Sequence, residues 1–292
     1  MNADAEADAD ADADADVIAS LGEELAVLGV RPGATLLVHA SLRRVAAGPD
    51  AVLAALRTAL GPEGTLVVPT FTAGNSDTSP AYRDRTRNMT TDQIRAMREQ
   101  MPAFDPDETP SEGMGRLAEA VRCAGGRVRS AHPQTSFAAV GARAGELLAV
   151  HDENCHLGER SPLGPLYAAG ALVLLLGVGF EVCSAFHLGE YRVPGAPRRT
   201  YRCVVRRDGE RSWIEYEDVA LDDSDFGALG ADFEKQDAAR SHPVVRGGRV
   251  GAAHARLFPL GAAVDFATAW LAGKRSLHVF TDPSQIAARF LH

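Results

Sequence analysis

The alternation of apolar runs with helically spaced segments predicts strands and helices in turn along most of the chain. Residues 35–40 (TLLVHA), 65–71 (TLVVPTF) and 172–180 (LVLLLGVGF) are short and nearly continuously apolar, as in strands buried on both faces. Residues 50–61, between the first two runs, have the apolar spacing of a helix and end on Gly61. A strand, a helix and a second strand of these lengths form a βαβ unit, so we expect an α/β protein with a mostly parallel central sheet.

Two segments break this pattern. Residues 72–110 are polar and longer than a plain connection, and insertions of this kind commonly build binding sites. Residues 199–218 (RTYRCVVRRDGERSWIEYED) contain Asp208-Gly209, a turn sequence typical of antiparallel hairpins. We therefore expect an antiparallel hairpin region in addition to the parallel sheet.

The composition changes this picture mainly at the N-terminus. At 292 residues and 46% hydrophobic, the chain can bury a large core as one extended domain or two small ones. Residues 1–16 alternate Ala with six Asp and one Glu and contain no basic residue. Because this segment cannot bury apolar area, we expect a disordered tail at 1–16 and a single domain at 17–292. The tail also supplies seven of the nine net negative charges, which therefore say little about the substrate.

The same inspection disfavours several partners and locations. Arg residues are scattered and not interleaved with aromatic residues, so we expect no nucleic-acid partner. The longest uncharged apolar run, Ala171–Phe180, is too short to span a bilayer, and residues 1–16 lack the basic and apolar parts of a signal peptide. The irregular spacing of Cys123, Cys155, Cys183 and Cys203 indicates reduced thiols in the cytoplasm rather than a disulfide framework.

Histidines at the ends of predicted strands or in turns are the first candidates for chemistry: His39, His132, His156 and His187. From Ser184 the apolar run at 172–180 gives way to helical spacing, which places His187 and Glu190 on one helical face. They would lie just beyond the carboxyl end of a central strand, where open α/β sheets bind ligands. A histidine oriented by a carboxylate is a minimal general base, although a satisfied core histidine beside a solvated glutamate fits the pattern as well.

Other catalytic templates mostly fail. The chain has no GxSxG elbow, no GxxxxGK[ST] loop and no well-placed GxGxxG turn. His151–His156 (HDENCH) and the Cys183/His187 pair lack a closed ligand set, so we expect no metal site. The phosphate-binding turn of the common GCN5-related acetyltransferases has one near match, Arg192–Pro197, in which Pro197 removes a needed amide donor.

Six blocks of the sequence, taken in order, resemble the aminoglycoside 3-N-acetyltransferase family: LLVHASLRRV, LGPEGTLVVPTFT, MPAFDPDETPSEGMG, VRSAHPQTSFAAVG, GERSPLGPLY and LLLGVGFEVCSAFHLGEYR. The resemblance runs from about Leu21 to the C-terminus. It implies a three-layer α/β/α fold unrelated to the GCN5-related one. It also implies acetyl-CoA as the donor and the 3-amino group of a 2-deoxystreptamine antibiotic as the acceptor, with resistance as the outcome.

The resemblance also implies roles for particular residues. The catalytic histidine corresponds to His187, with Glu190 beside it and Asp218 as a further acidic partner, or Glu217 in its place. Residues expected to face the coenzyme are His39, Ala40, Ser41, Leu42, Thr70, Gly113, Met114, Gly115, Arg116, Ser130 and His132. A cationic acceptor needs acidic residues, and the candidates are Asp77, Glu190, Glu217 and Asp225.

An acetyl thioester is already activated, so direct attack by the amine is sufficient. His187 would take the proton of the attacking amine, and Asp218 or Glu190 would stabilise the imidazolium. The sequence does not distinguish two candidates for the group that donates a hydrogen bond to the oxyanion: the backbone amides near residues 39–42 and the Ser41 hydroxyl.

Three alternatives remain: a same-fold acyl-CoA N-acyltransferase acting on a different biosynthetic amine, a hydrolase using Ser41 and His187, and a protein that only sequesters the antibiotic. We expect a monomer or a homodimer.

Overall fold

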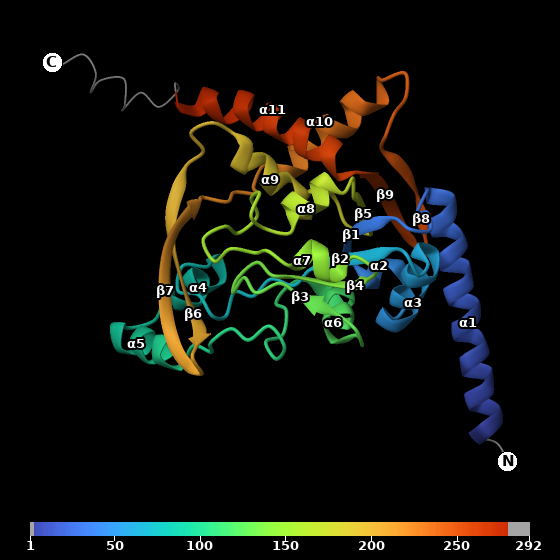
Figure 1. The fold of residues 1–292 in the computed structure, drawn as a ribbon, viewed down its shortest axis with the longest axis horizontal. Helices are drawn as coiled ribbons and strands as arrows, with labels where there is room; N and C mark the ends of the chain where they lie inside the picture. Colours follow the sequence, from blue (N-terminus) through green and yellow to red (C-terminus); the bar gives the residue numbers. More distant parts are fainter. Residues whose placement is uncertain (1–2, 280–292) are drawn as a thin grey trace.

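A seven-stranded sheet in the order β3-β4-β2-β1-β5-β9-β8 forms the middle layer of the computed structural model, which describes residues 3–279 (Figure 1). β1 pairs with β2 on one side and with β5 on the other, both in parallel, and only β4 and β9 run against the common direction of the sheet. The mostly parallel sheet is therefore confirmed. Its strands are β1 (Thr35–Ala40), β2 (Thr65–Pro69), β3 (Val128–Arg129), β4 (Phe137–Gly141), β5 (Leu172–Leu176), β8 (Arg246–Val250) and β9 (Ala253–Pro259).

Helices cover both faces of the sheet, which confirms the three-layer α/β/α prediction. Alternate residues of β1 point into two separate cores: Leu36 and Val38 into one, and Leu37 into the other. The first core is closed by α1 (Ala3–Leu28), α2 (Leu42–Val45), α3 (Pro49–Leu60) and α6 (Gly115–Cys123). The second is closed by α7 (Ala144–Leu148), α8 (Leu163–Ala168), α9 (Ala185–Arg192), α10 (Phe226–Ala238) and α11 (Leu260–Val279).

The central strand β5 is shorter than its apolar run. It ends at Leu176, whereas the run suggested a strand to Phe180, because Gly177 adopts a left-handed backbone with φ of 67°. A Cβ atom at Gly177 would lie 3.0 Å from the Cβ of Arg44, so a larger residue could not make this turn without displacing α2, which carries Arg44. The chain then passes through a 3₁₀ turn, η1 (Phe180–Val182), into α9. The turn thus carries the start of α9 to the carboxyl end of the sheet.

The N-terminal Ala/Asp segment lies, from Ala3 onward, within the first helix of the structure, and its disorder stays a prediction. α1 begins at Ala3, which is consistent with the high helix propensity of alanine. Its buried residues begin at Leu21 and continue at Leu25 and Leu28, one face of the helix. Asp14, Ala15 and Asp16 are exposed, and the N-terminal part of α1 extends away from the other elements (Figure 1).

The predicted hairpin is confirmed. β6 (Arg198–Arg207) pairs with β7 (Glu210–Val219), and the two turn residues, Asp208 and Gly209, both have positive φ, as a two-residue hairpin turn requires. The hairpin lies at the end of the molecule opposite α1 (Figure 1). From the 72–110 insertion, α4 (Pro80–Thr86) and α5 (Thr91–Gln100) pack on it through a small apolar cluster.

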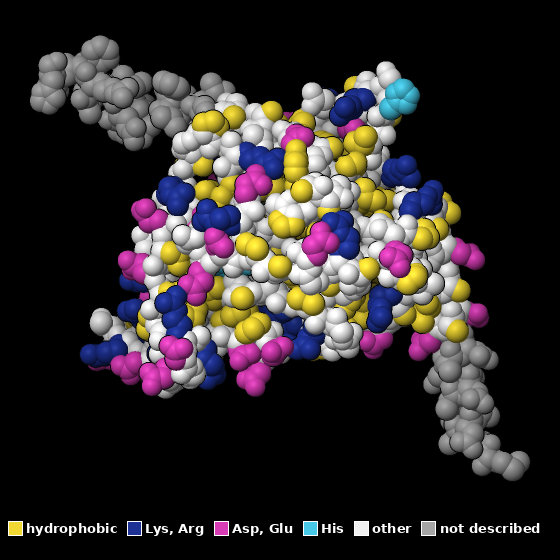
Figure 2. Space-filling model, in the orientation of Figure 1, with side chains coloured by type: hydrophobic (Ala, Val, Ile, Leu, Met, Phe, Trp, Pro, Cys, Tyr) yellow, Lys and Arg dark blue, Asp and Glu magenta, His cyan; other side chains and the backbone are white. Residues whose placement is uncertain are grey.

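Acidic and basic side chains are interspersed over the face shown in Figure 2. Among the helices described, none combines the length and apolar character needed to cross a bilayer.

Candidate active site

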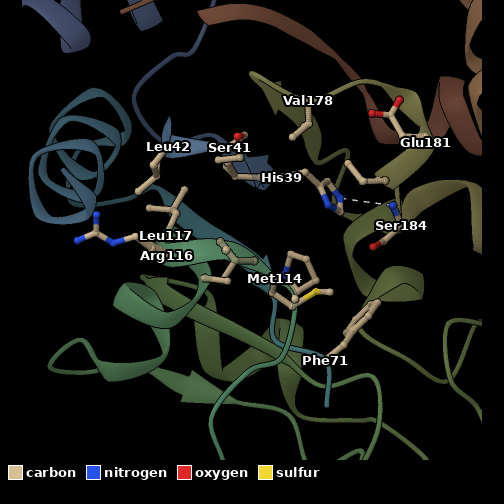
Figure 3. Close-up of a pocket in the computed structure, with 18 of the residues that line it drawn as sticks. His39, Ser41, Leu42, Phe71, Met114, Arg116, Leu117, Val178, Glu181 and Ser184 are labelled. Atoms are coloured by element: carbon tan, nitrogen blue, oxygen red, sulfur yellow. Dashed lines mark hydrogen bonds between the residues drawn. The ribbon is translucent and has the colours of Figure 1, made fainter. Parts of the chain in front are cut away.

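A cavity of about 530 Å³ opens at the carboxyl ends of β1, β2 and β5 (Figure 3). β2 and β5 flank β1 on opposite sides, and such a change of direction in strand order is where α/β sheets form ligand crevices. Of the residues predicted from the sequence to face a coenzyme or to act in catalysis, nine line this one cavity: His39, Ala40, Ser41, Leu42, Gly113, Met114, Gly115, Arg116 and His187.

His187, on α9, is held by Glu190 one turn further along the same helix. The His187 Nδ1 atom lies 2.5 Å from Glu190 Oε2, and the two side chains are 12% and 1% exposed. Because the carboxylate can only accept, Nδ1 carries the proton, which leaves Nε2 as the basic nitrogen. The i,i+3 pairing predicted from the sequence is therefore present.

The other oxygen of Glu190 is held from outside α9. Arg275 Nη1, on α11, donates to Glu190 Oε1 at 2.5 Å, and the backbone amide of Asp222 donates to the same oxygen at 3.1 Å. Arg275 also binds Asp225, with Nη2 donating to Oδ1 at 2.8 Å. Asp225 was expected to bind the acceptor, but its carboxylate pairs with this guanidinium. Sequence reasoning missed Arg275 because it lies 85 residues from Glu190 and belongs to no local motif.

His39 is the second histidine of the cavity. It is 6% exposed at the end of β1, and its Nε2 accepts a hydrogen bond from the backbone N–H of Ser184 at 3.4 Å (Figure 3). Burial, and then the proximity of His187, lower the pKa of His39 to about 4. His39 is therefore uncharged near neutral pH.

Asp218 is not the partner of His187. Its Oδ2 accepts from His156 Nδ1 at 2.8 Å, from the backbone N–H of His156 at 2.7 Å, and from the Tyr191 hydroxyl. Burial opposes ionisation of Asp218, but the hydrogen bonds from His156 and Tyr191 lower the pKa of its carboxyl. The resemblance to the family indicated Asp218 without indicating which loop packs against β7, and the loop that does so carries His156. Glu217, its neighbour on the strand, is exposed.

Ser130 and His132 do not line the cavity either. His132 is fully buried. Its ring stacks on His151, with 4.6 Å between centroids, and lies tilted against His156, with 4.7 Å between centroids. Its Nδ1 accepts from the backbone amides of Gln134 and Thr135, so the turn at Pro133 folds back onto the ring. Burial holds the pKa of His132 well below its ordinary value. Expecting a coenzyme contact from His132 was wrong.

Ser130 and Thr70 have structural partners. The Ser130 hydroxyl bonds His151 Nδ1 at 2.9 Å. Thr70 is fully buried and its hydroxyl bonds Ser136, while its neighbours Pro69 and Phe71 reach the cavity instead. Alternation of side chains at the end of β2 accounts for this difference.

The acidic residues of the cavity are not those expected. Asp77 is buried between Arg98 Nε at 3.0 Å and Arg202 Nε at 3.1 Å, where it ties the insertion to the hairpin. Glu181 and Asp223 line the cavity and were missed, although Glu181 lies within one of the six sequence blocks. Within residues 3–279, no group of three or more His, Cys, Asp or Glu side chains is arranged to hold a metal ion.

Together, the three-layer fold and a carboxylate-held histidine in a crevice at the sheet's carboxyl edge define an α/β enzyme outside the GCN5-related class. The family model for aminoglycoside 3-N-acetyltransferases matches residues 37–272, and the chain belongs to this family. The resemblance carried by the six sequence blocks is thereby confirmed.

Named relatives cover most of the chain. The SPbeta prophage-derived aminoglycoside N(3')-acetyltransferase-like protein YokD of Bacillus subtilis is 36% identical over 89% of this chain and 94% of its own length. Aminoglycoside N(3)-acetyltransferase VII of Streptomyces paromomycinus is 37% identical over 87% of this chain and 91% of its own. These relatives confirm the predicted enzyme class.

Solved structures agree with the fold. The crystal structure of YokD superposes with a TM-score of 0.80 at 35% identity, covering 88% of this chain and 99% of that one. AAC-IIIb in a binary complex with CoASH has a TM-score of 0.75 at 29% identity, with coverage of 88% and 96%. AAC-VIa bound to sisomicin has a TM-score of 0.72 at 31% identity, with coverage of 88% and 97%.

Proposed function

We propose that this enzyme transfers the acetyl group of acetyl-CoA to the 3-amino group of a 2-deoxystreptamine aminoglycoside, which gives resistance to the drug. The donor is supported by the CoASH-bound neighbour and by the residues that line the cavity. Arg43 and Arg116 are exposed at its edge, where guanidinium groups suit phosphates. Leu42, Met114 and Val178 provide apolar surface for the thioester arm.

The acceptor is supported by the sisomicin-bound neighbour and by the acidic residues near His187. Glu181 and Asp223 line the same cavity as His187, and neither makes an ion pair with a described residue. Both carboxylates are thus available to the ammonium groups of an aminoglycoside. Asp77 and Asp225 are already neutralised by arginines, so we assign the acceptor contacts to Glu181 and Asp223 instead.

In this proposal His187 is the general base. Its Nε2 removes the proton of the attacking amine, while Glu190 stabilises the imidazolium through Nδ1. The Cys155, Cys183 and Cys203 thiols are free and buried, and burial raises the pKa of Cys183 to about 12, so no thiolate competes as a nucleophile there. Reduced buried thiols also fit the cytoplasm, where we place the enzyme.

The observation that carries the proposal is the His187–Glu190 pair inside a crevice of the aminoglycoside 3-N-acetyltransferase fold. The test is mass spectrometry of several aminoglycosides after incubation with the protein and acetyl-CoA, with NMR to locate the acetyl group. We expect addition of one acetyl group at the 3-amino position.

Each other outcome would indicate a different function for this protein. Release of CoASH without an acetylated product indicates a hydrolase. Acetylation of other amines but not of aminoglycosides indicates the biosynthetic acyltransferase. Retention of unmodified drug indicates a sequestering protein.

A further inference from the structure

The His39 ring has a fixed tautomer. The backbone N–H of Ser184 can only donate, so the Nε2 atom of His39 that it meets at 3.4 Å must be the acceptor. In a neutral imidazole the other nitrogen then carries the proton. Nδ1 of His39 is therefore a hydrogen-bond donor.

That donor has no partner among the side chains that the structure describes, those of residues 14–275. No hydrogen bond joins Nδ1 of His39 to any of these residues, and Nδ1 is not one of the buried polar atoms that are fully enclosed without a partner. The ring lines the cavity that also contains His187, and Figure 3 shows it between the end of β1 and Ser184, above Met114. An unpaired N–H in a crevice is available to a ligand oxygen.

The position of the His39 ring is also fixed relative to His187, the general base. Ser184 is the residue before α9, and its carbonyl accepts from the backbone N–H of His187. The hydrogen bond from Ser184 thus ties the His39 ring to the helical turn that bears His187. Because an amide donates to its only basic nitrogen and burial lowers its pKa to about 4, the ring stays neutral through the neutral pH range.

We propose that His39 is a catalytic residue whose Nδ1–H binds the thioester carbonyl oxygen and stabilises the oxyanion that forms during acetyl transfer. The inference rests on the proposed acetyl-transfer function and goes beyond it by naming the donor. A preorganised neutral donor aimed at developing charge is the arrangement that lowers the barrier of acyl transfer.

The step balances as follows. The amine lone pair forms a bond to the carbonyl carbon, the C=O π electrons move to the oxygen, and His187 Nε2 takes the amine proton. When the oxyanion collapses, the C–S bond breaks, its electron pair leaves on sulfur, and the imidazolium returns the proton to the thiolate. His39 donates a hydrogen bond throughout and transfers no proton.

One competing donor is already occupied. The Ser41 amide donates to the carbonyl oxygen of Leu176 at 2.9 Å as part of the β1–β5 pairing, so it cannot also bind an oxyanion. The Ser41 hydroxyl lines the cavity and serves as the comparison in the test.

The test uses His39→Leu, His39→Asn and Ser41→Ala in the full chain. His39→Leu should lower kcat about 100- to 1000-fold, the usual loss for one oxyanion donor, with much smaller changes in the KM of either substrate. His39→Asn places an amide N–H near the Nδ1 position and should restore at least about tenfold of that loss. Ser41→Ala removes the competing hydroxyl donor, and the kcat of this variant should fall at least about tenfold less than that of His39→Leu.

A second readout needs neither the acceptor nor turnover. The infrared carbonyl stretch of carbonyl-labelled acetyl-CoA should shift to lower frequency on binding to the unmodified protein and to His39→Asn, but not to His39→Leu. An unshifted carbonyl on the unmodified protein would overturn the inference even if His39→Leu did not fold. So would equal shifts, or equal kcat, in the unmodified protein and a folded His39→Leu.

The two proposals fail separately. If aminoglycosides are acetylated normally by His39→Leu, His39 is not the donor while the proposed function stands. If the unmodified protein acetylates no aminoglycoside, the proposed function fails, and the carbonyl shift still decides the role of His39.

Discussion

Among residues 14–275, whose side chains the structure describes, two histidines are held by carboxylates, and the two pairs have similar geometry but different surroundings. In both, the carboxylate accepts from Nδ1: Glu190 at 2.5 Å from His187, and Asp218 at 2.8 Å from His156. His187 lines the cavity. His156 is 2% exposed, and its Nε2 lies 3.3 Å from both Gln134 Oε1 and the Tyr216 hydroxyl.

The difference teaches that a histidine–carboxylate pair is not by itself a catalytic signature. The basic nitrogen of His187 is open to a substrate, whereas the corresponding nitrogen of His156 is enclosed by protein groups. Tyr191 joins the two regions, because it follows Glu190 on α9 and donates to Asp218. We therefore expect the first pair to act in chemistry and the second to hold the hairpin against α9.

The largest expected effect is on turnover. His187→Ala should lower kcat by about two to four orders of magnitude, because general-base catalysis is lost while both substrates still bind. Steady-state kinetics with one well-used aminoglycoside measure this.

His156→Ala is the matched control. It removes one hydrogen bond to the buried Asp218 carboxylate and should destabilise the fold by about 1.5–3 kcal/mol, yet kcat of the folded protein should stay within about tenfold of normal. Near-normal kcat in His187→Ala, with loss in a folded His156→Ala, would reverse the assignment.

We expect acid to destabilise the fold through the buried histidines around the second pair. Burial lowers the pKa of His151 to about 4 and lowers the pKa values of His132 and His156 as well. The unfolded chain therefore binds more protons than the folded one between about pH 4 and 6.5, so stability is greatest above pH 6.5 and is lost as pH falls.

Across that window, each such histidine should lower the free energy of unfolding by about 1.4 kcal/mol for every unit by which the pH falls. Denaturant unfolding between pH 7.5 and 4.5 measures the slope. His242→Gln, at an exposed histidine outside the cluster, is the control variant. A flat profile would contradict the account of the cluster.

A smaller effect is expected at Arg275. Arg275→Gln removes the cation that balances Glu190, so the imidazolium of His187 should become easier to form and the acidic limb of kcat/KM should move up by about one pH unit. Other ionisable groups near His187 are His39, His156 and Asp222, together with Glu181 and Asp223 in the cavity lining, and the substitution leaves all of them in place.

Arg275→Lys keeps the charge and should keep the limb near its original pH. A purely structural role would lower kcat in both variants without moving the limb. An unmoved limb in Arg275→Gln would therefore remove Arg275 from the electrostatics of the site.

The structure also shows which features could be predicted from local sequence. The bounds of β1 match the apolar run at 35–40, the Asp208-Gly209 turn is where expected, and His187 meets Glu190 because i,i+3 residues share a helical face. Each of these depends on neighbours in sequence.

The contacts that sequence reasoning missed join segments that are far apart along the chain. Asp218 and His156 are 62 residues apart, and Arg275 and Glu190 are 85 apart. Whether an acidic residue meets an arginine, a buried histidine or a cavity depends on how loops pack, and no local pattern records that. For the same reason Asp77 and Asp225 could not be distinguished from Glu181 and Asp223.

The smallest expected effect is at the N-terminus. Deleting residues 1–16 should leave kcat unchanged and the melting temperature nearly so, because the buried face of α1 starts at Leu21 and Asp14–Asp16 are exposed. Thermal unfolding and kinetics of the truncated chain measure this. A large fall in melting temperature would show that the acidic segment packs on the domain.

The central claim is that His187–Glu190 acts in catalysis and His156–Asp218 does not, because only His187 has an accessible Nε2. Histidine ¹⁵N NMR across pH tests this claim most directly. The account predicts that Nε2 of His187 takes up a proton over the same pH range in which kcat/KM falls, while His156 remains neutral through that range. The assignment of each signal comes from its loss in His187→Ala or His156→Ala. Protonation of His156 in step with the fall in kcat/KM, with His187 unchanged, would contradict the account.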